Sequence, residues 1–220
     1  METKYIRREL SAVIEEAYRY FSVITVTGPR QSGKTTLIRN LFPHLPYYSL
    51  ENLDVRSFAE NDPVAFLNQH TEGMILDEVH NAPNLLSYIQ GMVDADADRR
   101  FILSGSSQFA MLKKVTQSLA GRTAVFELLP MSYSEIREIA ADTPLDHLLF
   151  NGFYPAIYSG RNVPKFLYPA YMKTYLDKDV RDLLQIKDMM QFHTFIRLCA
   201  GRIGSLFKAS ELANEIGISS

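Results

Sequence analysis

Residues 28–36 read Gly-Pro-Arg-Gln-Ser-Gly-Lys-Thr-Thr and follow the apolar run Val-Ile-Thr-Val at residues 23–26. The residues of this loop are Gly28, Pro29, Arg30, Gln31, Ser32, Gly33, Lys34, Thr35 and Thr36. They form a complete Walker A pattern, in which a strand leads into a glycine-rich turn that opens a helix. The alternative interpretation is a chance glycine-rich turn before a helix.

A loop of this kind binds phosphate because its backbone N–H groups and the N-terminus of the helix surround the anion. Lys34 is then expected to reach the β- and γ-phosphates of a nucleotide, and Thr35 to bind Mg²⁺. The pattern therefore predicts a nucleotide-binding loop that is formed by all of residues 28–36.

The composition is that of an ordinary globular chain, with 220 residues, a formal net charge of -2 and one cysteine, Cys199. This length allows a full α/β core and a smaller second unit. The charge gives no general attraction to nucleic acid, and the lone cysteine suits a reducing compartment. The N-terminus lacks a secretion signal, and no apolar run approaches the ~20 residues that span a bilayer. We therefore expect a cytoplasmic protein without membrane contacts.

Short apolar runs alternate with helical patterns in the first part of the chain. The runs cover residues 22–27, 47–50, 73–76, 100–104 and 124–128, and helical spacing marks residues 85–93 and 109–119. Each run is continuously apolar, as in strands that are buried on both faces. The repetition predicts an α/β fold with a mainly parallel sheet between helices. Pro63 is expected to begin one of these helices.

After Pro130 the pattern becomes helical. Helices are expected at about residues 134–141, 145–150, 165–185, 189–200 and 211–216, the last with Ser210 as its N-cap and Gly217 as its stop. We therefore divide the chain into a P-loop core at residues 1–130, a helical lid or connector at residues 131–163 and a helical region at residues 164–220.

The third apolar run leads into two acids, Asp77 and Glu78. Asp77 is placed to hold Mg²⁺ directly or through a water, and Glu78 to polarise an attacking water. Because Mg²⁺ keeps several waters, Thr35 and one carboxylate are sufficient protein ligands. The alternative is a pair of helix N-cap carboxylates. Two adjacent acids favour hydrolysis over transfer to another acceptor, and they indicate an extra strand between those of the two motifs.

That extra strand is predicted at residues 100–104, and its end carries hydroxyl and amide side chains. A group that senses the γ-phosphate is expected there. We choose Ser106, with Ser104 and Gln108 as substitutes. The alternative is a Ser/Gly turn that caps the next helix.

Arg122 precedes the last apolar run, near the sheet edge. It is a candidate arginine finger or sensor, either in cis or, within a homo-oligomer, in trans. The alternative is an arginine at a helix C-terminus beside Gly121. Arg181 is a weaker candidate, because charge clusters on long helices are usually solvated.

Several segments match, in order, the motifs of a known family. They are residues 5–10 (Tyr-Ile-Arg-Arg-Glu-Leu), 27–36, 48–51, 76–79, 101–106, 119–122, 127–132, 152–155 and 175–181. The chain thus resembles the prokaryotic AAA-type P-loop ATPases that carry a C-terminal region of unknown function. The resemblance covers nearly the whole chain, and Gly-Pro-Arg-Gln before Ser-Gly-Lys-Thr is more specific than Walker A alone.

The resemblance implies an AAA-like sheet with strand order 5-1-4-3-2, then a helical region, a winged-helix-like module and a nuclease-like region. The chain departs from this pattern in two ways. It ends at residues 216–220, where the turn of a helix-turn-helix is expected, so we expect a truncated C-terminal part. His80 stands where the family commonly has Gln.

Together the motifs predict Mg²⁺-dependent binding and hydrolysis of ATP, coupled to a conformational change, with ATP and Mg²⁺ as cofactors. The expected catalytic residues are Glu78, Lys34, Ser106 and Arg122, and the expected metal ligands are Thr35 and Asp77. One alternative is a nucleotide-gated module that binds DNA or protein through its C-terminal region with little turnover. A less favoured alternative is a small-molecule kinase, for which the sequence indicates no acceptor pocket.

Overall fold

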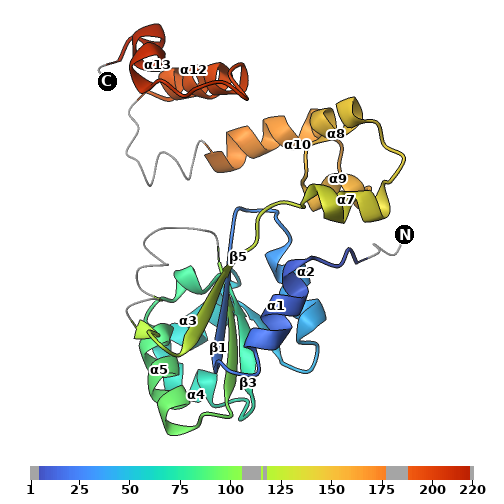
Figure 1. The fold of residues 1–220 in the computed structure, drawn as a ribbon. Coiled ribbons are helices and arrows are strands. Elements are labelled where there is room, and N and C mark those ends of the chain that lie inside the picture. Colours follow the sequence, from blue (N-terminus) through green and yellow to red (C-terminus); the bar gives the residue numbers. More distant parts are fainter. Residues whose placement is uncertain (1–4, 106–114, 116–117, 177–187, 219–220) are drawn as a thin grey trace. The chain divides into compact units, whose positions relative to one another are not determined.

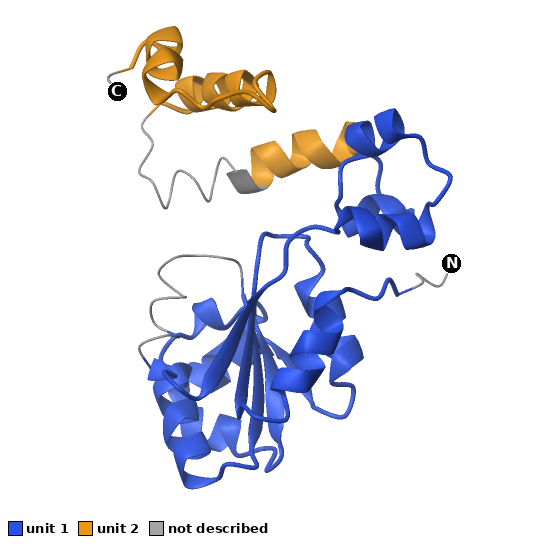
Figure 2. Cartoon of the chain, in the orientation of Figure 1, with its two compact units in different colours: residues 1–163 blue, residues 164–220 orange. Residues whose placement is uncertain are grey.

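The structure is a computed structural model that describes residues 5–105, 115, 118–176 and 188–218. The chain divides into two compact units, Met1–Val163 and Pro164–Ser220, which Figure 2 shows in different colours. The first unit holds the sheet, and the described part of the second is helical. Among the described residues, no helix combines the length and the apolar character that crossing a membrane requires.

Five parallel strands form the sheet of the first unit (Figure 1). They are β1 (Val23–Thr27), β2 (Tyr47–Ser49), β3 (Gly73–Asp77), β4 (Arg100–Ser104) and β5 (Thr123–Glu127). Their order across the sheet is β2-β3-β4-β1-β5. The predicted order 5-1-4-3-2 is therefore confirmed. Because β4 lies between β1 and β3, the carboxyl ends of these three strands are neighbours at one edge of the sheet.

Helices cover both faces of this sheet. They are α1 (Leu10–Ala17), α2 (Lys34–Leu41), α3 (Leu53–Asn61), α4 (Pro63–Leu67), the 3-10 turn η1 (Val79–Asn81) and α5 (Leu85–Ala95). Val23 and Met74 pack with residues of α3, α4 and α5, whereas Ile24 and Ile75 pack with residues of α1 and α2. Successive strand residues thus enter opposite cores, which is why the strands are continuously apolar.

Side-chain caps start two of these helices. Asn52 accepts hydrogen bonds from the first backbone N–H groups of α3, and Asp62 does so for α4. Pro63 is the first residue of α4, as predicted. The apolar pattern did not predict α1 and α3. Ile14 is the fully buried apolar residue of α1, and Ala59 is that of α3.

Three short helices follow the sheet in the first unit: α7 (Tyr133–Ile139), α8 (Leu145–Asn151) and α9 (Pro155–Tyr158). A small apolar core of Met131, Ile136 and Leu148 lies among them. α7 begins at a capping box, in which the Ser132 hydroxyl accepts from the Glu135 N–H and the Glu135 carboxylate accepts from the Ser132 N–H. This reciprocal pair fixes the point at which the chain enters α7.

The second unit contains α10 (Pro164–Tyr171), the π-helical segment η2 (Met172–Leu176), α12 (Met189–Ala200) and α13 (Ala209–Ile216). The long helix predicted from about Lys165 to Gln185 is helical as far as Leu176, where the α-helix α10 is followed directly by the π-helical η2. Pro169 lies inside α10 and has no N–H for the helical ladder, which weakens the helix just before this change. Residues 177–187 lie outside the described part of the chain.

Two further helix predictions have clear outcomes. α12 spans the predicted residues 189–200 and is capped by Asp188. The choice of Ser210 as an N-cap is wrong, because α13 begins at Ala209, two residues before the predicted start, and follows Lys208. Gly217 has a left-handed φ of 78° and ends α13 as predicted. The helix predicted at residues 109–119 lies mainly outside the described residues.

Gly73 and Gly91 form a matched pair that tests the packing of the first unit. A Cβ on Gly73 would lie 1.7 Å from the Arg100 carbonyl oxygen, and φ is +113°, so Gly73→Ala should lower the free energy of unfolding by at least ~2 kcal/mol. Gly91 is exposed within α5, and a Cβ there meets nothing within 4 Å. Gly91→Ala should therefore stabilise the unit by about 0.5–1 kcal/mol. Urea unfolding measures both changes, and equal stability of the two variants would contradict the packing.

Candidate functional site

The loop between β1 and α2 adopts backbone conformations that favour glycine. Gly28 has a φ of 141°, and Gly33, the N-cap of α2, has a φ of 98°. A Cβ on Gly28 would lie 2.2 Å from the carbonyl oxygen of Leu128, so glycine is required where the loop approaches the end of β5. Gln31 is left-handed as well, with a φ of 63°. The result is a turn of the anion-binding kind at the N-terminus of α2.

Lys34 and Ser32 are buried polar residues of this loop. The Lys34 ammonium donates to the carbonyl oxygens of Gly28 (2.9 Å) and Pro29 (3.0 Å). Burial lowers the pKa of Lys34, although the nearby carboxylates of the site act in the opposite direction. The Ser32 hydroxyl is buried and has no hydrogen-bond partner within the described residues. A buried hydroxyl without a hydrogen-bond partner destabilises the folded state. A ligand oxygen that bonds to Ser32 would remove this destabilisation.

Asp77, the last residue of β3, accepts four hydrogen bonds. Its Oδ2 accepts from the hydroxyls of Thr35 (2.7 Å) and Tyr47 (2.8 Å). Its Oδ1 accepts from the Ser104 hydroxyl and from the backbone N–H of Glu78 (3.1 Å). Asp77 is 4% exposed, and this full set of donors is what a buried carboxylate requires. The acid therefore links α2, β2 and β4 to the end of β3.

Tyr47 is a residue of this site that the sequence did not predict. Its register partner in β3 is Ile75, two residues before Asp77, so Tyr47 and Asp77 lie on the same face of the sheet. Burial and then the hydrogen bond to Asp77 raise the pKa of Tyr47, so its hydroxyl keeps the proton that it donates. The sequence gives no signal for this hydrogen bond, because a tyrosine in a strand is common and only the pairing of β2 with β3 brings Tyr47 to Asp77.

The Thr35–Asp77 pair fits a magnesium ion. Both side chains offer oxygen atoms, the ligands that Mg²⁺ prefers. Because Thr35 donates its proton to Asp77, the lone pairs of its hydroxyl oxygen stay available for a cation. The pair adjoins the anion-binding loop, where the phosphate oxygens of a nucleotide would add further ligands.

Glu78 follows Asp77 in a left-handed backbone conformation, with a φ of 55°. This region is uncommon for a residue other than glycine, and such strained positions concentrate at functional sites. The Oε2 atom of Glu78 lies 3.1 Å from Nδ1 of His80. The structure thus places the two predicted acids side by side and brings the second into contact with His80.

Arg122 does not lie at this edge of the sheet. It precedes β5, whereas the P-loop follows the carboxyl end of β1, the parallel neighbour of β5. Its Nε lies 2.5 Å from Oδ1 of Asp94 in α5. The geometry therefore conflicts with a finger role in cis and fits a structural ion pair.

The other sensor candidates are only partly described. Ser106, Gln108 and Arg181 lie outside the described residues. Ser104 is described, and its hydroxyl donates to Asp77. Ser104 therefore belongs to the network around the predicted metal ligand.

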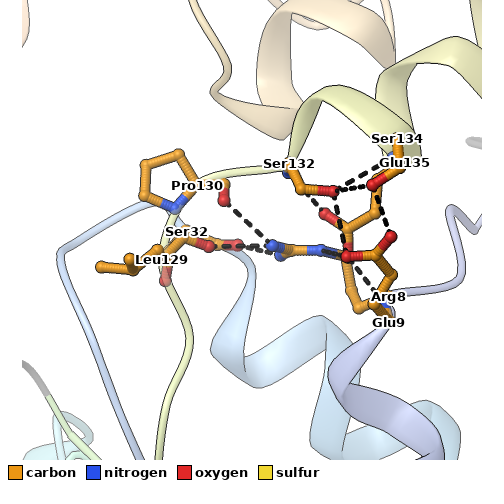
Figure 3. A network of polar contacts seen from close by, with 8 residues as sticks. All are labelled: Arg8, Glu9, Ser32, Leu129, Pro130, Ser132, Ser134 and Glu135. Carbon is orange, nitrogen blue, oxygen red and sulfur yellow. Dashed lines mark hydrogen bonds and ion pairs between the residues drawn. The ribbon is translucent and has the colours of Figure 1, made fainter.

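A second buried network, shown in Figure 3, contacts the P-loop at a backbone carbonyl group, that of Ser32. Arg8 donates from Nη1 to the carbonyl oxygen of Ser32 (2.9 Å) and from Nη2 to those of Leu129 (2.8 Å) and Pro130 (3.2 Å). Its Nε donates to Oε1 of Glu135 at 2.9 Å. Arg8 is 7% exposed and Glu135 4%, so this ion pair is buried.

Glu135 receives further donors. Its Oε1 also accepts from the N–H of Glu9 (2.7 Å), and its Oε2 from the N–H of Ser132 (2.8 Å). Burial alone would raise the pKa of Glu135, but the bonds from Arg8, Ser132 and Glu9 outweigh burial and leave the pKa below its ordinary value. The sequence did not predict this pair. The Ser-x-x-Glu pattern at residues 132–135 signals a capping box, but nothing local connects it with Arg8.

The fold and the loop together define an AAA-type P-loop ATPase fold, which generally binds ATP with Mg²⁺. Residues 20–137, more than half of the chain, match the family described as AAA domain, and the chain belongs to this family. Residues 142–220 match a domain of unknown function, DUF8612. The predicted AAA-type family is thus confirmed, whereas the winged-helix-like and nuclease-like regions stay predictions.

Two curated relatives and a solved structure are similar to the chain. Uncharacterised proteins of Mycobacterium tuberculosis and Mycobacterium bovis are each 29% identical over 221 residues, which cover 96% of this chain and 48% of theirs. The chain thus spans about half the length of the curated relatives it matches. A Walker-type ATPase of Pyrococcus abyssi aligns with a TM-score of 0.58 at 13% identity, over 98% of this chain and 91% of that one. That likeness shows a shared fold.

The Arg8–Glu135 pair predicts a stability that depends on pH. The folded-state pKa of Glu135 lies below its ordinary value of 4.5, so its contribution is complete above that pH and is lost as the pH falls through the folded pKa. Glu135→Gln keeps the shape but does not titrate. The excess stability of the wild type over this variant should therefore shrink as the pH falls below about 4.5. Urea unfolding at each pH measures it, and a constant difference would contradict the prediction.

Proposed function

We propose that the chain binds ATP with Mg²⁺ and hydrolyses the ATP. The observation that carries this proposal is the Thr35–Asp77 hydrogen bond of 2.7 Å, with Glu78 next in the chain. It joins an anion-binding loop to two carboxylates at the carboxyl edge of a parallel sheet, where α/β folds bind their ligands. Membership of the AAA domain family supports the same function.

Phosphate binding falls to residues 28–36. The Lys34 ammonium has three N–H donors, and its bonds to Gly28 and Pro29 engage two of them. The third donor, the buried Ser32 hydroxyl and the loop amides would bind phosphate oxygens. An anion beside Lys34 would also oppose the effect of burial, because it favours the charged ammonium.

Hydrolysis falls to the two acids. Thr35 and Asp77 would hold Mg²⁺, which neutralises charge on the phosphate oxygens, and Glu78 would orient the attacking water. In the structure the Glu78 carboxylate lies 3.1 Å from the His80 ring nitrogen. The carboxylate therefore has to share this contact, or exchange it for water, when it acts as a base.

Four further roles are proposed for residues other than Lys34, Thr35, Asp77 and Glu78. Ser106 is the proposed γ-phosphate sensor. Arg122 lies at the amino end of β5, so we assign it a finger role only in trans, on the P-loop of a second subunit. We assign coupling to a conformational change to the connector at residues 131–163, and a DNA or protein partner to residues 164–220. A gated binding module would hold ATP without turnover, and a kinase would release ADP only with an acceptor present.

Replacement of Glu78 separates hydrolysis from binding. Glu78→Gln keeps the volume but removes the carboxylate, so ATP hydrolysis should fall about 10²–10⁴-fold while the affinity for a non-hydrolysable ATP analogue stays unchanged. Phosphate release and analogue binding by calorimetry measure the two effects. Equal release by the variant and the wild type, above a blank without protein, would remove Glu78 from the mechanism.

Replacement of Thr35 tests the metal site by binding alone. Thr35→Ala removes one oxygen ligand, so the Mg²⁺-dependent gain in affinity for the ATP analogue should be largely lost, whereas Thr35→Ser should keep it. Binding of Mn²⁺ to the analogue complex, followed by electron paramagnetic resonance, gives a direct second readout. Unchanged Mn²⁺ binding by Thr35→Ala would exclude Thr35 as a ligand.

A further inference from the structure

Arg8 contacts the P-loop but takes no part in the chemistry proposed above. It is a buried arginine just before α1. In Figure 3 its guanidinium lies between Ser32, Leu129 and Pro130 on one side and Glu135 on the other. A charged group so placed requires several partners, and its hydrogen-bond partners Ser32, Leu129, Pro130 and Glu135 belong to other segments of the first unit.

The contact with Ser32 fixes one peptide group of the loop. The Ser32 carbonyl oxygen accepts from Arg8 Nη1 at 2.9 Å, and the peptide between Ser32 and Gly33 is trans. The C=O and N–H of a trans peptide point in opposite directions, so the N–H of Gly33 faces away from Arg8. Gly33 could readily adopt other backbone conformations, and the hydrogen bond from Arg8 to the preceding carbonyl group restricts this freedom. The N–H is thereby held toward the anion-binding side of the loop.

The remaining contacts of Arg8 tie this peptide to the start of α7. Nε pairs with Glu135, whose second oxygen caps α7. Nη2 binds the carbonyl oxygens of Leu129 and Pro130, between β5 and α7. A planar guanidinium fixes all these directions at once, which a flexible ammonium does not. Displacement of α7 would therefore break bonds to Arg8 and release the Ser32 carbonyl.

We propose that Arg8 is a positioning residue that couples the phosphate-binding form of the P-loop to the docking of α7. This inference rests on the proposed function, in which the loop binds a nucleotide. A bound nucleotide favours the loop conformation that Arg8 holds, and thus favours the intact Arg8–Glu135 pair. Coupling of this kind is reciprocal, so a change at Glu135 has to alter nucleotide affinity.

Hydrogen exchange of the nucleotide-free full chain tests the action of Arg8 on the loop. Arg8→Lys keeps the charge but loses the planar guanidinium, so amide exchange within residues 30–36 should become at least about fivefold faster, with exchange in β3 unchanged. Arg99→Lys is the matched control. Arg99 is 8% exposed and binds the carbonyl oxygens of Leu67 and His70 at the amino edge of the sheet. Unchanged loop exchange in Arg8→Lys, or equal acceleration in the control, would overturn the inference.

Nucleotide affinity tests the coupling to α7. Binding of a non-hydrolysable ATP analogue with Mg²⁺ should weaken about fivefold or more in Glu135→Gln, although the Glu135 carboxylate bonds to Arg8, Glu9 and Ser132 and, within the described part of the chain, to no residue of the P-loop. Arg8→Lys combined with Glu135→Gln should bind no more weakly than Arg8→Lys alone, because both changes break one linkage. If the double variant lost affinity by the product of the two single losses, the two residues would act independently and the coupling would be overturned.

The two measurements separate this inference from the proposed function. If the wild type does not bind the analogue, the proposed function fails, and the exchange comparison still decides whether Arg8 holds the loop. If the wild type binds and Glu135→Gln binds equally well, the coupling is wrong and the nucleotide site stands. If Arg8→Lys does not fold, Glu135→Gln, which keeps the volume of the side chain, supplies both readouts.

Discussion

A carboxylate that is buried at the end of a strand requires hydrogen-bond donors, and Asp77 is such a carboxylate in this fold. Its donors come from α2, β2, β4 and the residue that follows it. The strand order makes this convergence possible, because β4 lies between β1 and β3 and brings Ser104 beside the acid. Backbone pairing thus assembles the candidate site, and the chemistry of its side chains depends on that assembly.

The residues that could be predicted are those whose place follows from local order. A loop or an acid directly after a buried strand lies at the strand end, which is why Lys34, Thr35 and Asp77 were identifiable. Tyr47 and Arg8 were not, because their partners lie 30 and 127 residues away in the chain. Arg122 shows the opposite case: its local pattern fits a finger, yet strand direction places it at the amino edge, where it pairs with Asp94.

Two buried arginines support opposite edges of the sheet. Arg8 binds carbonyl oxygens at the carboxyl edge, and Arg99 binds those of Leu67 and His70 at the amino edge. In both places a fixed cation satisfies carbonyl groups of the segments that flank the strands. Only Arg8 also pairs with an acid on a separate helix. The edge with the P-loop is therefore mechanically linked to α7, whereas the partners of Arg99 lie around α4.

The long separation of Arg8 and Glu135 also has a consequence for biosynthesis. Closing a loop of 127 residues costs entropy, and pairing of the strands that lie between Arg8 and Glu135 in the sequence offsets part of this cost. A nascent chain leaves the ribosome from its amino end, and the arginine emerges long before its acid. Arg8 can therefore contact Ser32 early in synthesis, whereas its pair with Glu135 can form only after residue 135 has been synthesised. The link between the P-loop and α7 is in this way completed only when most of the first unit has been synthesised.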